Sequence, residues 1–115
     1  LKNVYCINEI EVSPKNKIFK YEKGNFLLGK SENDSDEFDV LYYARSDIEN
    51  AVIPKQVKIV KNSSFYNHEN LKSIIFPKDS KLKIIESHSF TNSSIQKLVL
   101  PSSVDEIHGN NFYRF

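Results

Sequence analysis

The feature of this chain that most constrains its fold is a repeat of 23 and then 24 residues, marked by Pro54, Pro77 and Pro101. After each proline come two aliphatic residues three positions apart, and five positions later a phenylalanine. A period of this length is typical of repeat proteins, in which each unit buries its apolar residues against its neighbours. We therefore expect stacked coils, with function on a face of the stack. The three sets are Val57, Val60 and Phe65, then Leu82, Ile85 and Phe90, then Val104, Ile107 and Phe112.

Each repeat predicts two short extended segments and one turn. Residues 71–76 and 95–100 share an aliphatic spacing that alternates between inside and outside. The proline that follows ends the strand, because proline cannot donate to a ladder. The aliphatic pair after the proline predicts the second segment. The phenylalanine then stands among Ser, Asn and His, which is typical of a turn or a single helical turn. Stacking the coils predicts a structural spine of Phe65, Phe90 and Phe112.

The N-terminal part predicts a variation on the same unit. Residues 7–12 have the aliphatic spacing of the later strands and predict the first strand of the same face. Two apolar stretches, at 26–28 and 40–43, flank the acidic interval SENDSDEFD and predict a β-hairpin with a solvated turn, inserted within one coil. The predicted organisation is a single domain over 1–115, with an irregular repeat at 13–52, regular repeats at 53–76 and 77–100, and a partial repeat at 101–115.

These spacings resemble a known family. Pro-x-x-Val-x-x-Val, Ser-Phe and Leu-x-x-Ile-x-Phe-Pro, at this period, are similar to the BspA-like leucine-rich repeats of bacterial and protist surface proteins. The chain departs from the commonest form at Ser64 and Ser89, where the family has alanine, and at Asn67 and Ser93, where it has cysteine. The hairpin segment is similar through Val12, Ser13, Pro14, Asn16, Phe19, Gly24, Leu27, residues 41–43, Ile53, Pro54 and Val57.

The resemblance implies both a fold and a function. The implied fold is a right-handed leucine-rich repeat solenoid, mostly β, with short parallel strands on its concave face and turns or single helical turns on its convex side. The implied function is a non-catalytic module for cell adhesion, at the cell surface or secreted. Its partner would be a host or matrix protein, or another cell-surface protein. An intracellular, cytoplasmic scaffold built on the same solenoid is the alternative.

If the function is binding, the side chains that point out of the concave strands are the candidate ligand contacts. Alternation along each strand selects them. Ile75 and Val99 are expected side by side as exposed aliphatics, flanked by Lys72 and Lys97. The full set is Asn8, Glu9 and Glu11 on the first strand, Lys72, Ser73 and Ile75 on the next, and Gln96, Lys97 and Val99 on the last.

Composition argues against other partners. A net charge of +1 in 115 residues provides no broad basic field for the phosphates of a nucleic acid. No apolar run approaches the roughly 18 residues that span a bilayer, so we expect no membrane insertion within this segment. The single cysteine, Cys6, cannot form an internal disulfide and is expected as a small buried side chain.

Catalytic hypotheses have little behind them. His68, His88 and His108 invite a zinc site, but a 23-residue coil places them at different angles, so we expect no shared metal. The acidic run lacks the glycine and ligand spacing of an EF-hand, and a solvated hairpin tip explains it. Neither a Gly-rich phosphate loop nor a Ser-His-Asp order is present. We expect no enzyme and no cofactor; a metal-dependent enzyme is the remote alternative. The acidic side chains are Glu32, Asp34, Asp36, Glu37 and Asp39.

The two ends of the chain shape the last expectation. The chain begins at Leu1, without a methionine or a signal-peptide apolar region, and stops at Phe115 within a coil. Solenoids need capping units, because an uncapped end exposes apolar core and an unpaired strand edge. We therefore expect an excerpt of a longer array, whose last coil is covered by a further repeat or by a second copy in a homodimer.

Overall fold

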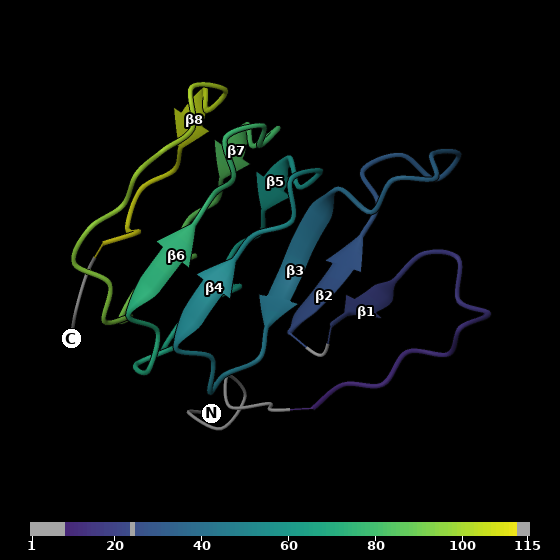
Figure 1. Cartoon of the computed structure of the whole chain (residues 1–115), viewed down its shortest axis with the longest axis horizontal. Helices are drawn as coiled ribbons and strands as arrows, with labels where there is room; N and C mark the ends of the chain where they lie inside the picture. Colours follow the sequence, from purple (N-terminus) through teal and green to yellow (C-terminus); the bar gives the residue numbers. More distant parts are fainter. Residues whose placement is uncertain (1–8, 24, 113–115) are drawn as a thin grey trace.

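The computed structural model describes residues 9–23 and 25–112, and within them it contains eight short strands and no helix (Figure 1). The first three strands form an antiparallel meander of β1 (Lys20–Glu22), β2 (Phe26–Gly29) and β3 (Val40–Ala44). The predicted hairpin across the acidic interval is therefore confirmed, since β2 pairs antiparallel with β3. The sequence did not predict β1, which extends the hairpin by a third strand.

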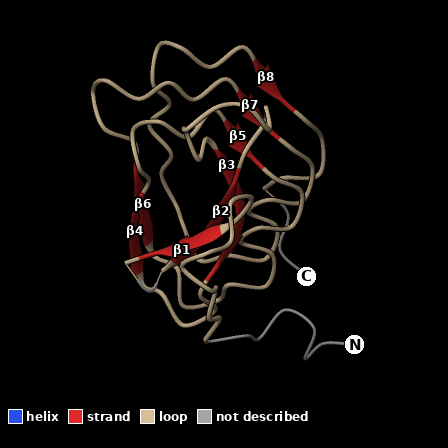
Figure 2. Cartoon of the chain, turned by 90° about the vertical axis from the view of Figure 1, so that its right-hand side faces the viewer, coloured by secondary structure: helices blue, strands red, loops and turns tan. Residues whose placement is uncertain are grey.

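From β3 onward the chain alternates between two sheets. β4 (Asn50–Val52) and β6 (Ser73–Ile75) pair in parallel to form a small sheet. The intervening strands join β3 in a larger sheet of order β1-β2-β3-β5-β7-β8. These strands are β5 (Ile59–Val60), β7 (Ile84–Ile85) and β8 (Glu106–Ile107), which pair in parallel. Figure 2 shows β4 and β6 on one side of the molecule and β3, β5, β7 and β8 on the other.

Parallel pairing places each repeat beside the previous one. Ala51 on β4 lies opposite Ile74 on β6, 23 residues later, as the sequence period predicts. The aliphatic pairs after the prolines supply β5, β7 and β8, so the second predicted segment of each repeat is a strand. The chain between the described ends contains no helix that is long and apolar enough to cross a bilayer. The single helical turns expected on the convex side are absent from residues 9–23 and 25–112, where ordinary turns replace them.

Two predicted strands are wrong. Residues 95–100 form no strand, although Ile95 and Leu98 still pack against the core. Residues 9–12 form none either, and residues 6–8, including Cys6, lie outside the described part of the chain. At β4, Lys23 and Asn25 from the β1–β2 turn line a groove together with Asn50. The hairpin turn thus lies where a strand at 7–12 would have paired with β4.

The core fills the space between the two sheets and is centred on phenylalanine rings. Phe65 and Phe90 are buried and stack, with ring centroids 5.1 Å apart and an interplanar angle of 21°. Phe26 from β2 meets Phe65 edge-on at 6.5 Å. Phe112 does not fit the predicted buried spine, because its side chain is 60% exposed and no described coil covers it. The largest buried aliphatic side chains are Leu28, Leu41, Ile53, Leu71, Leu82 and Ile85.

A conserved conformation, repeated along this one chain, surrounds each phenylalanine. The residues with positive φ, near +60°, lie two positions before the ring at Ser63, His88 and Asn110, and two after it at Asn67 and Asn92. Asparagine tolerates this left-handed region better than most residues. The Asn92 Nδ2 group also donates to Asn67 Oδ1 at 2.8 Å, so the turns of successive repeats are joined. This geometry explains why polar residues flank the phenylalanines.

Candidate interaction face

The small sheet presents an exposed aliphatic surface. Along β4 and β6 the side chains alternate, so that Ala51 and Ile74 are buried while Val52 and Ile75 are 58% and 54% exposed. The register pairs Val52 with Ile75. Val99, from the following repeat, is 67% exposed. We call this surface the β4–β6 face, and define it by Val52, Lys72, Ser73, Ile75, Gln96, Lys97 and Val99.

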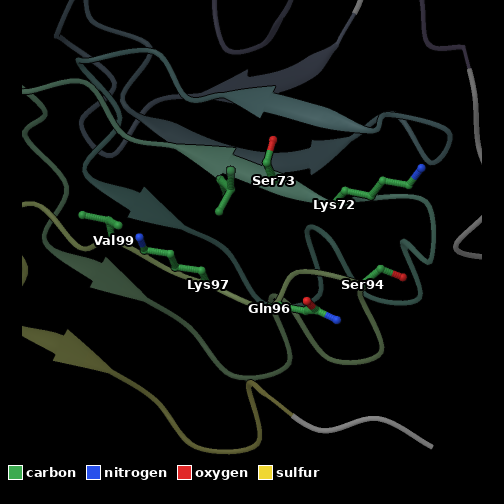
Figure 3. Close-up of a pocket in the computed structure, with 7 residues that line it drawn as sticks. Lys72, Ser73, Ser94, Gln96, Lys97 and Val99 are labelled. Atoms are coloured by element: carbon green, nitrogen blue, oxygen red, sulfur yellow. The ribbon is translucent and has the colours of Figure 1, made fainter.

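A groove of about 580 Å³ lies between β6 and the segment 95–100. In Figure 3, Lys72 and Ser73 lie on β6, and Gln96 and Lys97 lie on the neighbouring segment. Five of the predicted contact residues therefore line one groove, while Ile75 is exposed on the same strand. The full lining is Lys72, Ser73, Ile74, Ser94, Gln96, Lys97 and Val99.

The remaining predicted residues do not join this face. Glu11 lines a separate small groove with Val12 and Phe19, and Glu9 is exposed on the strandless segment before it. Sequence reasoning also missed Val52. The signal was available, because Val52 precedes Ile75 by 23 residues and so occupies the same repeat position.

The polar groups of the face are only loosely tied. Ser73 Oγ donates to Asn50 Oδ1 at 2.6 Å, across the β4–β6 pair. Lys72 Nζ lies 3.8 Å from a carboxylate oxygen of Glu49, but both side chains are mostly exposed, so this pair is worth at most about 1 kcal/mol. No acidic side chain of the described residues pairs with Lys97. The face therefore combines aliphatic surface with available positive charge.

The three histidines lie in different surroundings. His68 is buried, with Nδ1 2.9 Å from the Tyr66 carbonyl oxygen and Nε2 2.8 Å from that of Ala44. His88 contacts the Thr91 hydroxyl at 3.3 Å, and His108 Nε2 lies 3.1 Å from Glu106. Among residues 9–23 and 25–112, no three His, Cys, Asp or Glu side chains gather so that they could hold a metal ion.

The acidic interval is solvated except at Asp39. Asp39 is buried and accepts from the Ser31 N–H at 2.8 Å and from the Ser31 hydroxyl at 2.6 Å. Lys58 Nζ lies 3.8 Å from the same carboxylate. Burial alone would raise the pKa of Asp39, but the hydrogen bonds from Ser31 and from its own backbone, together with the Lys58 charge, outweigh it and hold this pKa below its usual range. Asp39 thus ties the two ends of the hairpin loop together.

This carboxylate should make stability depend on pH. Because folding lowers the Asp39 pKa, the ionised group stabilises the fold above its unfolded pKa of about 3.9, and this contribution is lost as the pH falls through the lower folded value. Asp39→Asn should cost about 1 kcal/mol at pH 7 and progressively less below about pH 4. Urea unfolding of both proteins at a series of pH values measures the difference. Parallel loss of stability in the two proteins would contradict the assignment.

The repeat architecture has a direct counterpart among known families. The family model described as a BspA type leucine rich repeat region of six copies matches residues 38–115. The chain belongs to the BspA-type leucine-rich repeat family. The matched residues include β3 to β8 and the phenylalanine turns, whereas β1 and β2 precede the match. No curated protein and no solved structure matches the chain significantly.

Membership narrows the function in general terms. BspA-type leucine-rich repeats suggest a protein-interaction module, and proteins that carry them are often associated with surfaces. Repeats of this family are generally non-catalytic. The resemblance drawn from the sequence is thereby confirmed at the level of the family.

Proposed function

We propose that this BspA-type repeat segment is a cell-adhesion module, at the cell surface or secreted, that binds a protein ligand through the β4–β6 face. In this proposal the coils form a right-handed solenoid, and β4, β6 and residues 95–100 line its concave side. The observation that carries the proposal is the row of exposed Val52, Ile75 and Val99 beside the lysines of the groove. A cytoplasmic scaffold that binds through the same face is the alternative, and would share this geometry.

The size of the face sets the expected affinity. Three strand positions at about 4.8 Å spacing, each about 20 Å long, provide roughly 300–400 Å². A stable protein complex buries about 800 Å² on each partner. A single copy of the segment should therefore bind weakly, and presentation of several copies should raise the apparent affinity through avidity.

The direct test is binding of the purified chain, presented in several copies on a bead, to an array of extracellular matrix and cell-surface proteins. The Lys72→Glu/Lys97→Glu variant should lose at least tenfold in affinity for the bound ligand, because it reverses the charge of the groove. Lys15→Glu/Lys17→Glu is the matched control, since both lysines are exposed and lie outside the face. Equal binding by the two variants, or no ligand on the array, would contradict the proposal.

We also propose that a second copy covers the β8 end. Among the described strands, only β7 pairs with β8. Ile107 and Phe112 are 39% and 60% exposed, at the repeat positions where Ile85 and Phe90 are buried. An open strand edge beside exposed apolar side chains favours self-association.

Sedimentation velocity over a wide concentration range tests this pairing. The chain should sediment as a dimer at high concentration, and Ile107→Glu should shift it to the monomer. Ile18→Glu is the control, because Ile18 is equally exposed but lies on the N-terminal loop. A monomer at all concentrations would exclude a homodimer through this end.

A further inference from the structure

The β6 strand has one open edge. On its paired side, the Ser73 N–H donates to the Glu49 carbonyl and the Ile75 carbonyl accepts from Ile53 N–H, at 3.3 and 2.9 Å. Alternate residues of a strand direct their backbone groups to opposite neighbours. The N–H and C=O groups of Ile74 therefore point away from β4, toward the groove. Ile74 lines that groove although it is only 7% exposed.

The next repeat leaves this edge unpaired. Ser94 N–H donates to the Leu71 carbonyl at 3.1 Å at one end of the groove, and the Ser103 hydroxyl donates to the Ser80 carbonyl at 3.2 Å beyond its other end. Between these links, within the described residues, the segment 95–102 makes no hydrogen bond to the preceding repeat. The spacing of 95–100 predicts a third strand here, and a groove is found instead.

The charge of the groove selects what can enter it. Lys72 and Lys97 lie on its two walls, together with the neutral polar side chains of Ser94 and Gln96 (Figure 3). The groove lining contains no acidic side chain. Lysine beside a strand edge discourages pairing with neutral or basic strands. A strand that carries a carboxylate would instead gain a charge-assisted contact with Lys97.

We propose that this groove binds an extended acidic segment of a partner protein, which adds to β6 as a strand. Its backbone pairs with the N–H and C=O groups of Ile74, and one of its carboxylates lies against Lys97. Strand addition of this kind takes affinity from main-chain hydrogen bonds and specificity from side-chain contacts. The inference rests on the proposed function, since the groove is part of the β4–β6 face, and it names the recognition mode and the chemistry of the partner.

A labelled chain and three synthetic peptides test the inference by NMR. The probe is acetyl-Thr-Val-Asp-Val-Thr-amide. One control peptide carries Lys in place of Asp, and the other carries Pro in place of the second Val, which removes a backbone donor. The probe should shift the Ile74 amide resonance and slow its hydrogen exchange, and both controls should bind at least tenfold more weakly. Lys97→Glu should weaken the probe at least tenfold and favour the Lys peptide, whereas Lys15→Glu should change neither.

Three results would overturn the inference. The first is slow exchange of the Ile74 amide in the free chain, which would mean that residues 95–100 close the edge themselves. The second is a probe that perturbs the β8 edge and not Ile74. The third is a Lys97→Glu variant with unchanged affinity. If a protein from the array depends on the face while the peptide fails, strand addition is wrong and the proposed function stands. If the peptide binds but no array protein depends on Lys72 and Lys97, the proposed function fails instead.

Discussion

Phe65→Ala should lower the free energy of unfolding by about 3–5 kcal/mol, which is the cost of a large cavity in a packed core. Phe65 is fully buried, and its ring contacts those of Phe26, His68 and Phe90, so it joins the hairpin, its own turn and the next repeat. A single domain has about 5–15 kcal/mol in total. The variant should therefore be unfolded, or close to it, near room temperature in modest urea.

Phe112→Ala provides the matched control, because it removes the same side chain from the same repeat position. Phe112 is 60% exposed, and its truncation should cost less than about 0.5 kcal/mol. Urea unfolding followed by circular dichroism, at a concentration where the chain is monomeric, compares the two variants. Equal destabilisation would mean that Phe112 is buried in solution, and that the phenylalanine spine extends through the last repeat.

The parts of the fold that the sequence predicted are those that its period determines. Fixed spacing of aliphatic residues after each proline places β5, β7 and β8 beside one another, because equal coil lengths bring equivalent residues into register. The same logic places Ile74 opposite Ala51, and it predicts the stacking of Phe65 on Phe90. A repeat is read well from one sequence because each copy repeats the evidence of the others.

The parts that the sequence did not predict depend on what happens at the ends of the stack. A strand requires a partner as well as an alternating pattern. Residues 9–12 have the pattern, but the β1–β2 turn lies beside β4. Residues 95–100 also have it, and within the described chain they remain separated from β6 by the groove. Apolar spacing cannot reveal whether a neighbouring segment is close enough to pair.

The candidate face was predictable in outline but not in detail. Alternation along the strand identified Ile75 and Lys72, and the period carried the same choice to Val99 and Lys97. That the lysines and the free side of β6 border one groove could not be read from the pattern, since it depends on the unpaired course of 95–100. The burial of Asp39 escaped notice for a similar reason. Its partner Ser31 lies at the far end of the hairpin loop, so only the folded loop brings them together.

His68→Leu should lower the free energy of unfolding by about 2–4 kcal/mol, although leucine fills a similar volume and is more apolar. The imidazole lies between the carbonyl oxygens of Tyr66, in its own turn, and Ala44, at the end of β3. A histidine ring donates from one or both nitrogens according to its protonation, and leucine donates none. A buried carbonyl that loses its donor costs about 1–3 kcal/mol. The loss should therefore exceed what the added apolar surface recovers.

Two further variants separate this hydrogen-bonding role from packing. His68→Gln keeps an amide that can donate to one carbonyl and should recover part of the loss. His108→Leu removes an exposed histidine paired only with Glu106 and should change stability by less than about 0.5 kcal/mol. Since Ala44 also donates its N–H to the Ser64 carbonyl, His68 is one of two links between β3 and the first phenylalanine turn. If His68→Leu is as stable as the parent chain, packing alone joins the hairpin to the repeats, and the hydrogen bonds of this histidine contribute nothing to the fold.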